Sequence, residues 1–156
     1  MYLEIDGIAG ESVSEQALGH IDINGWDINV SNGGTMHTGG GGGAGAASHG
    51  DVSIQKNMDK SSTALFKACA TGAHIAHATI RMYKSGGEQH MYASIKMENI
   101  LITSVNVGGS SGSDSMSENL TMNFSSYEYV YKPQNTDGTL AVQTELKYNI
   151  QGKRLK

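Results

Sequence analysis

The stretch NMDKSSTALFKACATG, residues Asn57–Gly72, is the part of this 156-residue chain whose apolar residues recur at helical spacing. Its apolar set is Leu65, Phe66, Cys69 and Ala70. The side chains available to cap free N–H groups at its start are those of Asp59, Ser61 and Ser62. Gly72 stands where a left-handed C-terminal cap belongs. The pattern predicts one amphipathic helix over about 62–71.

Strand patterns surround this segment on both sides. Residues of alternating spacing that are expected to share a buried face are Leu3 with Ile5, Ile21 with Ile23, and Leu120 with Met122 and Phe124. The predicted strand segments are 1–8, 20–30, 51–56, 73–84, 90–107, 118–132 and 139–150. A bulge at Gly25 is expected to return Trp26, Ile28 and Val30 to the buried side. The chain is therefore predicted to be mainly β, an antiparallel β-barrel or two-sheet sandwich with one flanking α-helix.

Composition limits the classes of function. The 38% hydrophobic content suits one domain over residues 1–156. The net charge of −4 argues against nucleic-acid binding and gives no polybasic membrane signal. No apolar stretch approaches the roughly 20 residues that span a bilayer. Cys69 is the one cysteine, so no internal disulfide can form. Glu4 and Asp6 stand where a secretory signal has a basic start and an apolar run, so any export is expected without such a signal.

The glycine tract GGGGGAGAASHG, residues Gly39–Gly50, invites three interpretations. It could be a phosphate cradle, a slack linker, or a loop that becomes ordered on meeting a partner. A G-x-G-x-x-G pattern falls on Gly40, Gly42 and Gly45, but dinucleotide binding needs a helix after the turn, and a strand is predicted here. No Gly-Lys-Ser/Thr ending completes a P-loop. The pattern therefore does not predict nucleotide binding, and no cofactor is expected.

Other possible catalytic groups are isolated along the chain. Residues 108–112 fit G-x-S-x-G around Ser110, but that motif needs a strand turning into a helix, whereas these residues join two predicted strands. A flexible hairpin connection is the simpler interpretation. Asp114 and Glu118 lie near a predicted loop and could form a weak pair of acids, but the simpler interpretation is that both are solvated residues of a turn. No nucleophile, base and oxyanion site assembles, so the chain is not expected to be an enzyme.

The histidines and acids do not predict a metal site. The six histidines are His20, His37, His49, His74, His77 and His90. His74 and His77 are three apart on a predicted strand, so they are expected on opposite faces. His37 and His49 could meet if the glycine tract closes into a loop, but zinc takes three or four ligands. Asp22, Asn24 and Asp27 resemble part of a calcium loop that lacks its glycine position and its final bidentate Glu.

A stripe of tyrosines follows one face of the segment SYEYVYK. Its members are Tyr127, Tyr129 and Tyr131. On a strand, such a stripe is most often a half-buried face with its hydroxyl groups at a wet edge. It could equally be a subunit contact, where tyrosine is enriched.

With the order of strands and helix in place, the whole chain resembles the haemolysin-coregulated protein (Hcp) family, the tube subunit of the bacterial type VI secretion system. The segments that carry the resemblance are 2–12, 20–26, 59–72, 83–124 and 131–138. Together these segments span nearly the full length of the chain, and they follow one another in the same order as in the family. The resemblance implies a ring of six subunits, with strands lining the lumen and the helix nearer the outside. Rings would stack into a tube inside a contractile sheath, tipped by a trimeric spike.

The resemblance also implies where rings touch. The long loop that reaches the adjacent ring maps onto about 31–50, so the glycine tract becomes the flexible middle of a ring-to-ring contact loop. The side chains expected to make the contact are Thr35, Met36, His37, Ser48, His49 and Asp51. Small effector proteins would travel in the lumen. The subunit would be cytoplasmic before contraction of the sheath and extracellular or inside a target cell afterwards.

Three functions are thus open. The first is a structural subunit of the exported tube, without an active site. The second is a soluble ring-shaped effector carrier or chaperone that forms no long tubes. The third is a small hydrolase that uses Ser110.

Overall fold

The computed structural model describes residues 1–34, 44–85, 90–135, 139 and 141–155. Its elements in chain order are β1 (Tyr2–Ile5), the short 3₁₀ helix η1 (Glu15–Ala17), β2 (Ile21–Asp22), β3 (Gly25–Asp27), β4 (Val30–Gly34), β5 (Ala44–His49), β6 (Val52–Asn57), α1 (Ser62–Thr71), β7 (His74–Tyr83), β8 (Met91–Gly108), β9 (Ser117–Asn123), β10 (Ser126–Tyr131), β11 (Thr144–Asn149) and β12 (Arg154–Leu155). The protein is mainly β with one α-helix among the described residues, as predicted.

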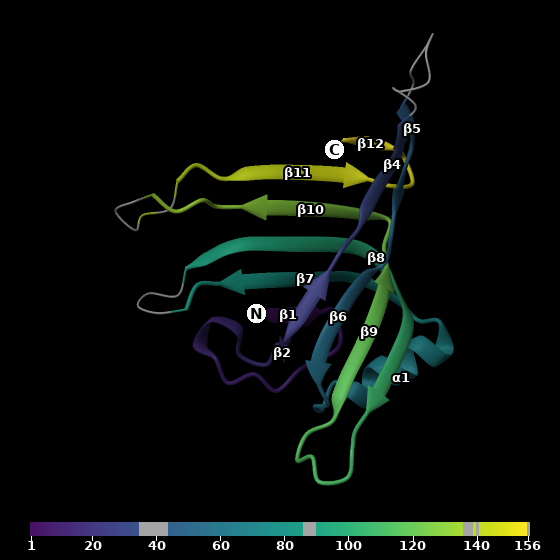
Figure 1. Ribbon diagram of the computed structural model, residues 1–156, viewed down its shortest axis with the longest axis vertical. Helices are drawn as coiled ribbons and strands as arrows, with labels where there is room; N and C mark the ends of the chain where they lie inside the picture. Colours follow the sequence, from purple (N-terminus) through teal and green to yellow (C-terminus); the bar gives the residue numbers. More distant parts are fainter. Residues whose placement is uncertain (35–43, 86–89, 136–138, 140, 156) are drawn as a thin grey trace.

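The strands form one large antiparallel sheet and one small one. The main path runs β12-β11-β10-β8-β7-β1-β2, and β8 also pairs with β9, which continues through β6 to β3. Figure 1 shows β7, β8, β10 and β11 as a stacked set, with β6 and β9 crossing at an angle beside α1. Strands β4 and β5 form a separate two-stranded sheet among the described residues and extend beyond the main sheet as a hairpin. Every pairing is antiparallel, which confirms the predicted fold class.

Strand β8 belongs to both parts of the main sheet because it changes direction near its middle. Asn99 has φ 53°, and the buried residues shift there from odd to even numbers, so that Met97 and Ile100 are both fully buried. The neighbouring strand β7 makes the same shift between Ile75 and Ala78. His74 and His77 are consequently both exposed, and the simple alternation used to separate them does not hold at this point of the strand.

Helix α1 begins and ends where the sequence predicts, and it packs on β8. Gly72 ends it in the left-handed conformation at φ 63°, which confirms the predicted cap. The helix buries Leu65 and Ala68, whereas Phe66 is 45% exposed and Ala70 is exposed. The prediction that Phe66 and Ala70 lie in the buried stripe is therefore wrong, because the sheet covers the helix along its 61–65–68 side.

The core lies between the two parts of the main sheet and under α1. Its largest fully buried apolar side chains are Leu3, Ile21, Ile54, Leu65, Ile80, Ile95, Met97, Ile100, Ile102, Leu120 and Met122. Trp26 and Ile28 pack against this core as expected. Val30 is 50% exposed, contrary to the prediction, because β4 leaves the main sheet to pair with β5.

The predicted strand segment 118–132 is two strands. It breaks at Phe124 and Ser125, after which β10 joins the other part of the main sheet. Strand β9 pairs with β6 and β8, while β10 pairs with β8 and β11. The turn thus transfers the chain from one part of the sheet to the other.

Candidate functional site

One face of the main sheet carries a continuous line of polar side chains, which we call the polar row. Its members, each paired directly with the next across five strands, are Glu4, Thr79, Lys96, Glu128 and Lys147. Opposite charges are neighbours along β8, β10 and β11, and the Nζ atom of Lys147 lies 3.4 Å from Oε1 of Glu128. Such cross-strand pairs favour the observed register. A shallow hollow lies over this face, lined by residues that include His77.

Glu4, the member of the polar row on β1, forms an ion pair with Arg81 of β7. Arg81 Nη1 lies 2.5 Å from Glu4 Oε2, and both side chains are partly exposed. The hydrogen bond from Arg81 holds the pKa of Glu4 below its ordinary value. Partial burial of Glu4 raises this pKa, but the positive charge of Arg81 also lowers it. The ion pair with Arg81 therefore favours the charged form of Glu4.

Replacing Arg81 with Gln is expected to raise the pKa of Glu4 toward its ordinary value. Since the folded-state pKa of Glu4 is depressed, the small stability from this pair is present above the unfolded pKa and is lost as pH falls through the folded one. A carbon-detected NMR titration of the Glu4 carboxyl group measures the change. Lys147→Gln, which removes a partner of Glu128, serves as the control and leaves Glu4 unchanged. An unshifted Glu4 titration in Arg81→Gln contradicts the assigned cause.

The opposite face of the same strands carries a line of apolar side chains, which we call the apolar row. Its members, again paired in order from β2 to β11, are Ile21, Leu3, Ile80, Ile95, Tyr129 and Leu146. The first four are at most 1% exposed, whereas Tyr129 and Leu146 are each 40% exposed. The apolar row thus leaves the core without losing its apolar character.

The tyrosine stripe follows this transition along β10. Tyr127 is 9% exposed and contacts Phe124 edge-on, while Tyr131 is 45% exposed. The stripe is therefore half-buried along its length, with its exposed part beyond the cover of the second part of the sheet. The stripe is thus the half-buried face that the sequence predicts. Tyr129 and Tyr131, its exposed members, stay candidates for the predicted subunit contact.

The predicted contact loop 31–50 is, in its described parts, the β4–β5 hairpin. Ser48 pairs with Ser31 and is exposed. Three of the predicted contact residues, Thr35, Met36 and His37, lie outside the described residues. The flexible middle predicted for the glycine tract lies largely outside them too.

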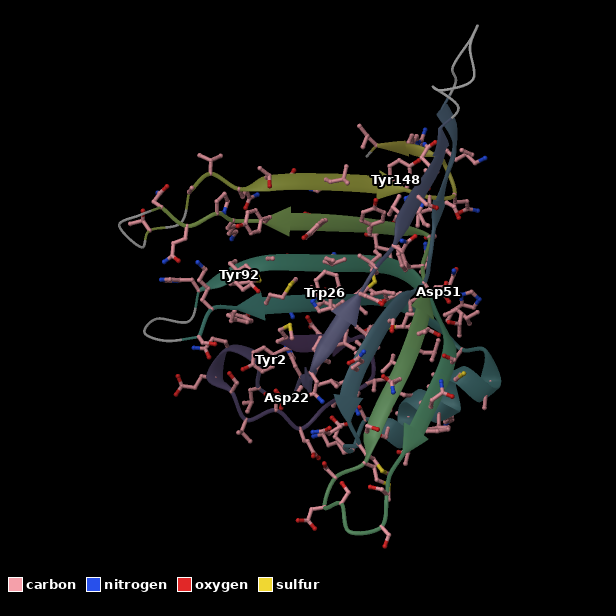
Figure 2. All side chains as sticks on the ribbon, in the orientation of Figure 1. Tyr2, Asp22, Trp26, Asp51, Tyr92 and Tyr148 are labelled. Carbon is pink, nitrogen blue, oxygen red and sulfur yellow. The ribbon has the colours of Figure 1, made fainter. Side chains whose placement is uncertain are left out.

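The base of the hairpin is attached to the subunit by the two remaining contact candidates. The ring of His49 stacks on Tyr148 with centroids 5.1 Å apart. Both carboxylate oxygens of Asp51 accept hydrogen bonds, from the Thr103 hydroxyl at 2.6 Å and the Asn123 amide at 2.7 Å. These contacts hold the base of the hairpin against the sheet. Figure 2 labels Tyr148 and Asp51 beside the place where the hairpin leaves the sheet.

The isolated motifs do not assemble into a catalytic or metal site in the part of the chain that the structure describes. The hollow beside Ser110 is lined by asparagine, glycine and serine residues, without a histidine or carboxylate to act as a base. Strand β5 occupies the second half of the glycine tract, where a nucleotide site needs the start of a helix. No three His, Cys, Asp or Glu side chains lie close enough to hold a metal ion among the described residues. Asn24, in the partial calcium pattern, instead donates a hydrogen bond to Asn57.

Sequence reasoning missed a buried ion cluster beneath the start of α1. Lys56 and Glu118 are both fully buried, and Lys56 Nζ lies 2.8 Å from Asp59 Oδ1 and 3.2 Å from Glu118 Oε2. Ser62 also donates a hydrogen bond to Glu118. Burial raises the pKa of Asp59, but hydrogen bonds from Lys56 and Ser61 outweigh it, so that the pKa lies below its ordinary value. Glu118 is therefore a buried residue of β9, and the prediction that it is a solvated turn residue is wrong.

The signal for this cluster was present in the alternation of β6. Val52 and Ile54 occupy the buried face, and Lys56 is the next residue on it. A charge on a buried face needs a partner.

Comparison with known proteins supplies the context for these surfaces. Residues 2–131 match the model of a family described as "Type VI secretion system effector, Hcp". The Protein hcp1 of Pseudomonas aeruginosa is 40% identical over 139 residues, which cover 88% of this chain and 86% of that protein. A solved structure described as that of a type six secretion system protein superposes with a TM-score of 0.94 at 22% identity, over 99% of this chain and 98% of the other. The crystal structure of Hcp1 from Salmonella typhimurium gives a TM-score of 0.79 at 24% identity, over 99% and 96%.

Proposed function

The chain belongs to the Hcp family of type VI secretion system effectors, and from this premise we propose that six copies close into a ring and that the rings stack into a hollow tube. The family and the fold make it a tube protein of this secretion system. The remaining questions are which surface lines the tube and which surfaces join the copies.

The observation that carries the proposal is the opposite character of the two faces of one sheet. A tube subunit needs a polar surface toward a water-filled lumen and an apolar surface toward its own core. The polar row supplies the first, and the buried part of the apolar row supplies the second. The polar row therefore faces the lumen, with α1 on the outer side.

Contact between rings is assigned to the β4–β5 hairpin together with residues 35–37 of the predicted contact loop. Its described strands extend beyond the main sheet (Figure 1), so the hairpin can reach a second ring without disturbing the core. The proposed contact residues remain Thr35, Met36, His37 and Ser48, while His49 and Asp51 act by holding the base of the hairpin. Ordering a glycine-rich segment costs conformational entropy, so the contact is expected to be weak and reversible.

The partners and location follow from membership in the secretion system. The proposed partners are the sheath, the trimeric spike and small effectors carried in the lumen, and the proposed route is from the cytoplasm to the outside of the cell with the tube. Among the described residues, no helix is both long and apolar enough to cross a membrane. The hydrolase hypothesis loses its support because, within the described part of the chain, the hollow beside Ser110 is lined by no histidine or carboxylate. A free ring-shaped carrier is the less favoured alternative.

A cysteine in the polar row tests which face lines the tube. In a Cys69→Ala background, Lys96→Cys is expected to react at the same rate with a small maleimide in rings and in monomers. A polymer-linked maleimide is expected to react at least about tenfold more slowly with stacked rings, because the lumen excludes it. Mass spectrometry of timed samples measures both rates, and negative-stain images establish that rings with a central hole are present.

Phe66→Cys in the same background is the matched control, since Phe66 is 45% exposed on α1. It is expected to react with both reagents at similar rates in every state. Slow labelling at position 66 with fast labelling at position 96 would reverse the assignment of inner and outer faces. A particle that stays monomeric at every concentration would contradict the tube itself.

A further inference from the structure

Charge is distributed unevenly along this chain. The first 55 residues contain no Lys or Arg. They contain seven acidic residues, Glu4, Asp6, Glu11, Glu15, Asp22, Asp27 and Asp51. Three basic residues, Lys147, Lys153 and Arg154, lie in the stretch from β11 through β12, which has Glu145 as its acidic member.

The part of the acidic region around β1 and β2 and the basic stretch lie at opposite ends of the main sheet. Strands β12 and β11 form one end of the strand order, and β1 and β2 form the other. Figure 2 shows Tyr148 of β11 and Asp22 of β2 far apart across the stacked strands. We call residues 6–22 the acidic end and residues 144–155 the basic end. In the acidic end, Glu15 and Asp22 are exposed, as are Lys153 and Arg154 in the basic end.

Both ends also carry exposed apolar side chains. In the basic end, Leu146 of β11 and Leu155 of β12 are 40% and 68% exposed. The adjoining strand β10 adds Tyr129, the partner of Leu146 in the apolar row, and Tyr131. At the acidic end, Val13 is 87% and Leu18 is 73% exposed. Tyrosine and other apolar residues flanked by charges are typical of a protein contact surface.

We propose that the subunit contact within the ring joins the acidic end of one copy to the basic end of the next. The exposed part of the apolar row is covered by the neighbouring copy near Val13 and Leu18. This inference rests on the proposed ring and assigns its lateral contact. A contact between two different surfaces repeats around a circle and can close into a ring, whereas a contact of one surface with itself stops at a dimer.

Electrostatics favours the head-to-tail pairing over its alternatives. Opposite charges attract between the ends, while two acidic ends or two basic ends repel each other. The apolar residues supply the buried area, and the charges select which end meets which. The pairing uses Lys153 and Arg154 of the basic end, so the polar row, with Lys147 as its last member, stays free to face the lumen.

Two charge-reversed variants test the pairing. One carries Glu15→Lys with Asp22→Lys, and the other carries Lys153→Glu with Arg154→Glu. Each variant alone is expected to need at least about tenfold more protein than the wild type to form rings, because each places like charges at every contact. An equimolar mixture is expected to restore rings near the wild-type concentration, with the two variants alternating in equal numbers. Sedimentation velocity measures assembly, and native mass spectrometry measures the composition of the ring.

A second pair of variants tests the apolar part of the contact. Tyr129→Gln is expected to weaken ring formation at least about tenfold, whereas Phe66→Gln, of similar exposure on α1, leaves it unchanged. Circular dichroism and thermal unfolding establish that all variants remain folded. If the wild type forms rings while the charge variants and Tyr129→Gln assemble normally, the assigned contact is wrong and the ring stands. Failure of the mixture to recover rings also overturns the pairing, and a monomeric wild type contradicts the proposed function instead.

Discussion

Lys56→Met is expected to lower the free energy of unfolding by about 3–5 kcal/mol, the range seen when one member of a buried ion pair is removed. The Lys56 ammonium group donates to Asp59, Ser62 and Glu118, and also to the Asn57 carbonyl oxygen at 2.7 Å. Without the Lys56 ammonium group, the Glu118 carboxylate stays fully buried and loses the cation that pairs with it. The loss also loosens the start of α1, because Asp59 and Ser62 are held there by the same group. Urea unfolding followed by circular dichroism measures the change.

The double variant Lys56→Met with Glu118→Leu is the informative control. Replacing both members of a buried pair with apolar residues is often neutral, so most of the lost stability is expected to return. Equal destabilisation in the single and double variants would show that packing around Lys56, rather than the unpaired charge, dominates. Lys60→Met, at an exposed position in the same turn, is expected to change stability by no more than about 0.5 kcal/mol.

Gly10→Ala is expected to destabilise the protein by about 3 kcal/mol, at the upper end of the cost of overpacking. A β-carbon at this buried position would lie 2.1 Å from the His20 carbonyl oxygen and 2.5 Å from Ile21 Cα. Both are backbone atoms, so no side-chain rotation can relieve the contact. The surrounding backbone is fixed by hydrogen bonds from Gly10 to the Gly19 carbonyl at 2.8 Å and from Ser12 to the His20 carbonyl at 3.0 Å.

Thermal unfolding measures this effect directly. For a chain of this size, about 3 kcal/mol corresponds to a fall of roughly 6–12 °C in Tm. Gly25→Ala is the matched control, because its β-carbon would meet Gln55 at 3.5 Å, an ordinary contact with a flexible side chain. It is expected to shift Tm by no more than about 2 °C. A Tm of Gly10→Ala close to that of the control would mean that the loop before β2 yields readily.

Sequence patterns predicted the elements of this fold better than their partners. The bounds of α1 and the buried alternation of Leu3 with Ile5 follow from periodicity, which is a local property. The burial of one side of α1 depends on where the sheet lies, and periodicity alone could not show that Phe66 faces away from it. The shift of register at Asn99 likewise depends on packing against both parts of the sheet.

The hairpin could not have been predicted by the same reasoning. All five residues of β4 are exposed, so no alternation of apolar and polar residues marks it as a strand. Its pairing with β5 is visible only when the two segments are placed together in space. The polar row was missed for the same reason, since it collects residues from strands far apart in the chain. Of the uncovered end of the apolar row, the sequence singled out Tyr129 but not its partner Leu146.

Strand β1 has a consequence for how the chain reaches its native state. It precedes the other strands of this sheet along the chain, yet it lies inside the sheet between β2 and β7, where Tyr2 pairs with Arg81. Contacts between such distant residues slow folding to milliseconds or seconds, because a long loop must close before they form. Leu3 and Ile5 therefore stay without their main partner until β7 has been synthesised, and a nascent chain halted before that point is expected to aggregate.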